Sequence, residues 1–303
     1  MDMTLNETQE AILSSVETML ARRRHTASHE LKDDAHYDFA LEQELCDAGF
    51  LDIVAAGGSH LDATLLVERV AREITVLPIG WRTLLWPALR CKTWPLVPWR
   101  VGVAELTRFA TSAHGVLAVD EGRNTVNLID IADCSVKDGG AAWGYPVGEV
   151  RARSSGRRLG ITVADFLALW RIALAAEIIG TAGAAFDQTI EYIKGRKQFG
   201  QPIGANQAIR HRAARLAVEV EKARYLIYEA ASRAPNHEFA AAAATAAALT
   251  GELVFKEAHQ MHGAIGYARE FPLHRWTMRL RVLCKELGGA QAHGRAVTAA
   301  HVG

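Results

Sequence analysis

A long run from Leu167 to Lys194, almost uniformly apolar through its middle, constrains the fold of this chain more than any other feature. A helix that is apolar on every side has to be buried. The most apolar part of the run, Ile172 to Ala185, is shorter than the roughly 20 residues that span a bilayer, and Glu177 lies inside it. The run therefore predicts the central helix of a soluble helical bundle.

Further helices are predicted around that centre. Asn206 to Arg233 is amphipathic, with one apolar stripe at helical spacing. Glu238 to His262 is rich in alanine and stops at Gly263, a usual helix end. A last helix follows Phe271 and Pro272. Long helices at this spacing predict an antiparallel bundle over residues 161–303.

The first zone of the chain, residues 1–94, also has helical patterns. Helices are predicted at Ala11–Arg22, Phe39–Ala48 and Asp62–Ile74. Thr4 and Glu7 have the spacing of a capping box in front of the first helix. This zone is therefore predicted to form an N-terminal helical domain.

The middle zone, residues 95–160, changes to short β-like runs. Gly115–Val119 and Thr125–Asp130 are separated by a turn cluster, and Ser154–Arg158 resembles an exit linker. So small a sheet needs a neighbour to cover it. The predicted fold class is mostly α with a small β domain between an N-terminal helical domain and a C-terminal helical bundle.

Composition and charge exclude several classes of function. Lys plus Arg and Asp plus Glu each number 34, so no net charge attracts nucleic acid or an anionic membrane. The four cysteines stand far apart, and the twelve histidines show no metal-ligand spacing. The N-terminus lacks the pattern of a signal peptide. We expect a cytoplasmic protein that binds neither metal, nucleic acid nor membrane.

Two short segments carry residues suited to ligand binding, Gly195–Gln207 and Gln260–Tyr267. In the first, the guanidinium of Arg196 can hold a phosphate with two hydrogen bonds, and Phe199 offers a flat apolar surface. In the second, Gly263 lets the backbone approach a ligand closely. Each segment alone is more often a solvated turn or a helix cap, so the two have to be interpreted together.

Together these segments resemble the acyl-CoA dehydrogenase family. Its Arg-x-x-Phe-Gly-(x)6-Gln pattern is matched by Arg196, Phe199, Gly200 and Gln207. Its Gln-x-x-Gly-Gly-x-Gly pattern is matched by Gln260, Gly263 and Gly266, with Ala264 in place of the second glycine. The resemblance implies a helical–β–helical flavoprotein that binds FAD non-covalently and desaturates an acyl-CoA thioester between its α and β carbons.

The resemblance also implies how the two segments act. In the family they hold the ADP half of the neighbouring subunit's FAD across a dimer interface. Carried over by matching positions, the cofactor-binding residues are Arg196, Gln198, Phe199, Ile203, Gln207, Gln260, Gly263 and Ala264.

The sequence departs from the family at the catalytic base, because abstraction of an α-proton needs a placed carboxylate. The family's two positions for that carboxylate correspond to Gly288 and Trp170, and neither can act as a base. Of the nearby carboxylates, Glu286 beside Lys285 is expected to be solvated, and Glu177 is expected to bond to a neighbouring helix. No catalytic residue is therefore assigned.

The middle domain departs as well, since the family's Thr-Glu-Pro-like loop, which touches the flavin ring, is missing here. The parts that serve a neighbour's flavin are kept, whereas the parts that serve the chain's own substrate are lost. The pattern is similar to the shortened subunits of actinobacterial steroid-degrading enzymes. It implies a heterodimer or heterotetramer with a full-length subunit that carries the base.

Two alternatives remain open. The chain can be a self-sufficient homomeric dehydrogenase with Glu286 as a relocated base, or a scaffold of the same fold that binds no FAD. The identity of the acyl group is not encoded in these spacings, and a steroid-derived acyl-CoA is favoured only by the resemblance.

Overall fold

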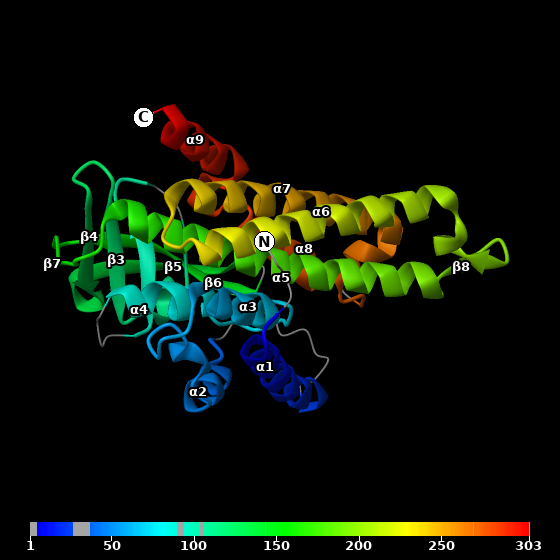
Figure 1. Ribbon diagram of the computed structural model, residues 1–303, viewed down its shortest axis with the longest axis horizontal. Helices are drawn as coiled ribbons and strands as arrows, with labels where there is room; N and C mark the ends of the chain where they lie inside the picture. Colours follow the sequence, from blue (N-terminus) through cyan, green and yellow to red (C-terminus); the bar gives the residue numbers. More distant parts are fainter. Residues whose placement is uncertain are drawn as a thin grey trace.

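The computed structural model describes residues 5–26, 37–89, 94–103, 106–142, 144–268 and 270–302 (Figure 1). Helices from the first part of the chain lie along one side of a long helical bundle, and the β strands gather at one end of that bundle. The predicted class, mostly helical with a small sheet region, is confirmed.

The N-terminal helices are short and amphipathic. Helix α1 begins one residue after Asn6, whose side chain accepts the Gln9 N–H at 2.9 Å while Gln9 accepts the Asn6 N–H at 3.1 Å. The cap is therefore Asn6 with Gln9; the predicted partner Thr4 lies outside the described residues, and Glu7 is already helical. The elements are α1 (Glu7–Thr26), α2 (Phe39–Asp47), η1 (Phe50–Asp52), α3 (His60–Ala71), η2 (Trp81–Leu85) and α4 (Trp86–Leu89).

The middle zone forms two small sheets with strand orders β1-β3-β4-β7 and β2-β6-β5. Strands β1 and β3 are parallel and the other pairs are antiparallel. The predicted linker is partly wrong, because Arg158 pairs with Asn127 and closes the first sheet. The strands are β1 (Leu96–Arg100), β2 (Thr107–Arg108), β3 (Gly115–Asp120), β4 (Thr125–Asp130), β5 (Cys134–Ala142), β6 (Tyr145–Ala152) and β7 (Arg157–Arg158), with one-turn helices η3 (Ala110–Ser112) and η4 (Ile131–Asp133).

Helix α5 (Val163–Gly195) is the centre of the bundle, as its apolar sequence predicts. It is capped by Thr162, whose hydroxyl accepts the Asp165 N–H at 3.0 Å, and it is buried on almost every side as far as Ala185. Around it pack α3, α6 (Gln207–Ser232), α7 (His237–His262) and α8 (Leu273–Leu283), and α9 (Gly289–Val302) packs on α7.

Among the described residues, one segment is long and apolar enough by composition to cross a membrane, His237–Tyr267. Its helix, α7, lies inside the bundle, and half of the apolar window is buried by neighbouring helices. The apolar character is therefore explained by packing.

Candidate cofactor-binding site

A hairpin follows α5 and carries the first predicted segment. Strands β8 (Lys197–Gln198) and β9 (Gln201–Pro202) pair with each other, and the hairpin projects from the end of the bundle (Figure 1). Phe199 and Gly200 form its tip with φ angles of 51° and 81°. The Phe199 ring is fully exposed at 101 %, so a large apolar side chain is held away from every part of its own chain.

The polar residues of this hairpin are available to a ligand. Among the described residues, the Arg196 guanidinium has no hydrogen bond or ion pair, and Gln198 and Gln207 are exposed. Ile203 is different, because it is half-buried and packs on the core. Its N–H donates to the Arg196 carbonyl at 2.8 Å, so Ile203 anchors the base of the hairpin.

The second segment lies where α7 ends and η6 (Gly263–Tyr267) begins. Gly263 has a φ of 65°, and a Cβ there would meet nothing within 4 Å, so backbone conformation explains this glycine. Gln260 and Ala264 are exposed beside it. Gly266 is buried, because a Cβ would lie 2.9 Å from the Cβ of His262.

The structure brings the two segments to the same end of the bundle. Tyr192, near the end of α5, accepts the Arg196 N–H on its carbonyl at 2.8 Å. Its hydroxyl donates to the carbonyl of His262 at 3.4 Å, directly before Gly263. A cation that no described residue pairs with, an exposed aromatic ring and open space over Gly200 and Gly263 therefore lie at one end of the bundle.

A second polar cluster lies where the N-terminal helices, the β strands and the bundle meet; we call it the junction. Arg108 of β2 is 3 % exposed and ion-pairs with Glu177 of α5 at 2.9 Å and with Glu286 at 2.7 Å. The Gly80 N–H donates to Glu177 at 3.1 Å, and the Trp170 indole N–H donates to Glu286 at 2.6 Å. No local sequence pattern indicates that these residues meet.

One expectation is corrected at the junction. Glu286 is not a solvated charge, since its side chain is 12 % exposed and lies between Arg108 and Trp170. Glu177 bonds to a neighbouring helix, as expected, because Gly80 lies in the helical segment that continues into η2 and donates its N–H to Glu177. Its second partner, Arg108 of strand β2, was not predicted. The signal that was missed is an arginine flanked by apolar residues at Leu106-Thr-Arg-Phe109.

Aromatic rings surround the Arg108 guanidinium. The ring centres of Trp81, Tyr145 and Phe109 lie 4.7, 5.0 and 5.8 Å from its central carbon. Burial raises the pKa of Glu177, and the positive charge of Arg108 opposes that rise. Although burial lowers the pKa of Arg108, the two carboxylates outweigh this effect and hold that pKa above its ordinary range. The guanidinium is therefore charged at every physiological pH.

The backbone after α8 explains why Glu286 turns inward. Leu287, Gly288 and Gly289 have consecutive positive φ angles of 55°, 84° and 68°. This tight turn places the Glu286 side chain beside Trp170. Trp170 and Gly288 correspond to the two positions at which the family carries its base. The turn at Gly288 brings Glu286 to Trp170, so this place in the fold holds an indole hydrogen-bonded to a paired carboxylate.

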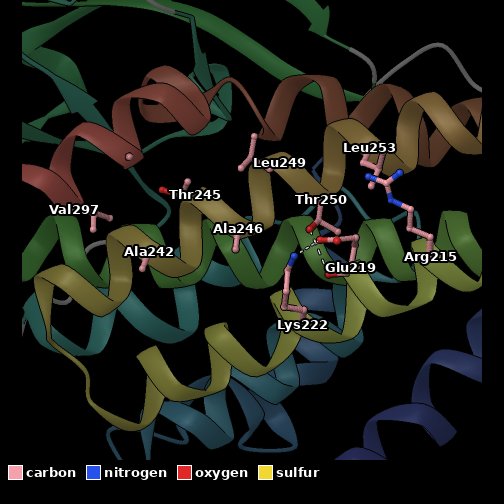
Figure 2. Close-up of a pocket in the computed structure, with 11 residues that line it drawn as sticks. Arg215, Glu219, Lys222, Ala242, Thr245, Ala246, Leu249, Thr250, Leu253 and Val297 are labelled. Carbon is pink, nitrogen blue, oxygen red and sulfur yellow. Dashed lines mark hydrogen bonds and ion pairs between the residues drawn. The ribbon is translucent and has the colours of Figure 1, made fainter.

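A surface groove of about 640 Å³ runs between α6, α7 and α9, away from both segments (Figure 2). Leu249 is 55 % exposed in it, and Lys222 pairs with Glu219 on the α6 side. None of the residues predicted to bind the cofactor lines this groove.

Comparison with known proteins identifies the class. Residues 160–302 match the family model for the acyl-CoA dehydrogenase C-terminal domain. Acyl-CoA dehydrogenase IpdE2 of Mycobacterium tuberculosis is 30 % identical, over 91 % of this chain and 92 % of that protein. The 3-sulfinopropanoyl-CoA desulfinase of Paraburkholderia xenovorans is 36 % identical over 124 residues, 40 % of this chain and 32 % of that protein. The match therefore spans only about a third of the latter relative.

Solved structures share the fold. A glutaryl-coenzyme A dehydrogenase in complex with glutaryl-CoA has a TM-score of 0.79 at 19 % identity, covering 100 % of this chain and 97 % of that one. The ChsE4-ChsE5 complex from Mycobacterium tuberculosis gives 0.81 at 20 % identity, covering 100 % and 99 %. The helical, β and bundle parts thus define an acyl-CoA dehydrogenase fold. The chain belongs to the acyl-CoA dehydrogenase family, whose members are FAD-dependent flavoproteins.

The residues present fit FAD at the end of the bundle. A diphosphate needs a cation, which Arg196 supplies without breaking any ion pair. The exposed Phe199 offers a face for stacking, and the open space at Gly200 and Gly263 admits close approach of a ligand to the backbone. The junction, in contrast, is filled by its own side chains.

Proposed function

We propose that this chain is a subunit of a heteromeric FAD-dependent acyl-CoA dehydrogenase that holds the ADP half of a flavin working in the partner's site. The observation that carries the proposal is the hairpin tip. Phe199 is fully exposed on a positive-φ backbone, beside an Arg196 that no described residue pairs with, so both side chains are available to a group outside the chain. The partner supplies the catalytic base.

The chain's own residues support a role in binding FAD and not in proton abstraction. FAD, when bound, supplies the hydride acceptor for desaturation of an acyl-CoA thioester. Arg196 binds the diphosphate, Phe199 excludes water from it, and Ile203 fixes the hairpin. At the junction, Glu286 is bound by Arg108 and Trp170 and has no free geometry toward a substrate. This arrangement supports a subunit without a base of its own.

The comparisons support a heteromer and a steroid substrate. The ChsE4-ChsE5 structure is a complex of two proteins, and the Tcur3481-Tcur3483 structure is a steroid acyl-CoA dehydrogenase, with a TM-score of 0.74 at 22 % identity. We infer that this chain pairs with a full-length acyl-CoA dehydrogenase subunit in a heterodimer or heterotetramer. Its substrate would be a steroid-derived acyl-CoA, and the complex would be located in the cytoplasm.

Co-expression with a longer family member tests the proposal. Alone, the chain is expected to bind FAD weakly and to show no dehydrogenase activity. The complex is expected to be yellow and active on an acyl-CoA, and to lose flavin on Arg196→Ala. Full activity from the purified chain alone would refute the proposal, and a stable complex that contains no flavin would favour a scaffold.

A second candidate, a homomeric enzyme with Glu286 as the base, has one observation in its favour. Glu286 lies 2.6 Å from the indole of Trp170, at one of the family's two base positions. The contacts of Glu286 oppose it, because one carboxylate oxygen accepts from Arg108 and the other from the Trp170 indole, so neither faces a substrate. Glu286→Gln in the active assembly decides: unchanged turnover excludes Glu286 as the base.

A further inference from the structure

We propose that Tyr192 and His262 form a stacked pair that sets the distance between the two cofactor-binding segments, and so act as positioning residues for the dinucleotide. This inference rests on the proposed function. Nothing in the Arg196 or Gln260 patterns includes Tyr192, which lies 70 residues before His262.

The first step is the contact between the two rings. The centres of Tyr192 and His262 lie 4.2 Å apart with an angle of 19° between the planes. Phe271 packs its edge on both rings, at 5.5 and 5.0 Å between centres. Three side chains from α5, α7 and the turn before α8 thus contact one another, and none of these contacts depends on a ligand.

The second step is that Tyr192 contacts the backbone of both segments. Its main-chain carbonyl accepts the Arg196 N–H at 2.8 Å, at the point where the hairpin leaves α5. Its hydroxyl donates to the His262 carbonyl at 3.4 Å, one residue before Gly263. One residue therefore joins the start of the hairpin, through its backbone, to the start of η6, through its side chain.

The third step concerns His262, which is 4 % exposed. Its Nδ1 bonds to the Ala258 carbonyl at 2.8 Å, so that nitrogen carries the proton. A Cβ on Gly266 would lie 2.9 Å from the His262 Cβ, which shows how closely η6 folds back over the histidine. Moving His262 therefore moves the turn that carries Gly263 and Ala264.

The experiment uses the co-purified complex and measures the dissociation constant of FAD by fluorescence of released flavin. Tyr192→Leu and His262→Ala are expected to weaken FAD binding roughly 3- to 10-fold, the usual range for an aromatic pair. Tyr192→Phe keeps the ring and should restore most of the affinity. Phe186→Leu, which removes an aromatic ring from α5 outside the pair, is the matched control and should leave it unchanged.

A double variant distinguishes a positioning role of Tyr192 from a general loss of structure. If Tyr192 acts by placing Arg196, then Tyr192→Leu with Arg196→Ala should bind FAD about as weakly as Arg196→Ala alone. Fully additive losses, equal losses in Phe186→Leu, or wild-type affinity in both Tyr192→Leu and His262→Ala would overturn the inference. If Arg196→Ala itself leaves FAD affinity unchanged, the proposed function fails instead.

Discussion

Charged and aromatic side chains are buried and paired at the junction, whereas they are exposed at the end of the bundle. At the junction, Arg108 is buried between two carboxylates and three aromatic rings, all from this chain. At the end of the bundle, Arg196 and Phe199 are exposed, and no described residue pairs with that guanidinium. In the proposed function, this difference means that the chain fills the place of its own base while keeping exposed groups for an external ligand.

The largest expected effect comes from breaking the junction. Arg108→Met leaves Glu177 and Glu286 buried without a counter-charge, so the free energy of unfolding should fall by about 3–5 kcal/mol. Urea unfolding of the chain measures it. Arg123→Ala, whose side chain is 80 % exposed in a surface pair, is the control and should cost about 0–1 kcal/mol.

A second variant keeps this prediction testable if Arg108→Met does not fold. Replacing Arg108, Glu177 and Glu286 together by Met, Leu and Leu removes the charges as a set, and should recover much of the lost stability. If Arg108→Met is as stable as the wild type, the junction is not held by its ion pairs.

The next effect concerns the open end of the bundle. A hydrogen bond to a charged group contributes about 1.5–3 kcal/mol, so Arg196→Ala in the complex should weaken FAD binding roughly 10- to 100-fold. Titration of the apo-complex with FAD measures the change. Arg158→Ala, an exposed arginine on β7, should leave the affinity unaltered; an equal loss there would mean that total charge, not the site, sets FAD affinity.

A smaller effect is predicted from His293 on α9, which is 1 % exposed and whose ring nitrogens have no hydrogen bond to any described residue. Burial lowers the pKa of His293 to about 4, with help from Arg171 and Arg100. Below about pH 6.5 the unfolded chain binds a proton that the folded chain excludes, so stability falls as pH drops from about 6.5 to about 4.

His293→Leu should therefore flatten this part of the stability profile and cost little at pH 7, because no hydrogen bond is lost. Urea unfolding at pH 7 and pH 5 gives the slope. The exposed His211→Leu serves as the control. An unchanged slope in His293→Leu would show that this histidine does not couple folding to protons.

The smallest effect is expected in the groove of Figure 2, which belongs to neither region. Leu249 is 55 % exposed there, so Leu249→Ser should change the free energy of unfolding of the lone chain by no more than about 0.5 kcal/mol. A loss above 2 kcal/mol, far outside the roughly 0.5 kcal/mol of ordinary surface changes, would mean that Leu249 is packed in the free chain.

Local pattern was enough to predict the longer helices and two of the strands, β3 and β4. The apolar run of α5 and the alternating runs of β3 and β4 depend on residues that are near in sequence. The missing base was also visible, since it needs only the identity of residues 170 and 288. The partners of Glu286 were not predictable, because Arg108 lies 178 residues away in the sequence. The adjacent Lys285 suggested instead that Glu286 is exposed to solvent.

The candidate site was predicted in outline for the same reason. Its residues fall in two short motifs, and the structure places both at one end of the bundle. The Tyr192–His262 stack lies between the two motifs and depends on how α5 packs on α7. No local sequence pattern predicts that packing. Ile203, predicted with the binding residues, is instead half-buried and anchors the hairpin.

The flavin content of the purified heteromer tests the central claim most directly. Denaturing the complex and comparing released FAD with protein concentration gives the ratio of flavin to chains. Because the junction is closed and the hairpin serves the partner, about one FAD is expected for each pair of this chain and its longer partner. Two FAD per pair, or a full equivalent held tightly by this chain alone, would contradict the account.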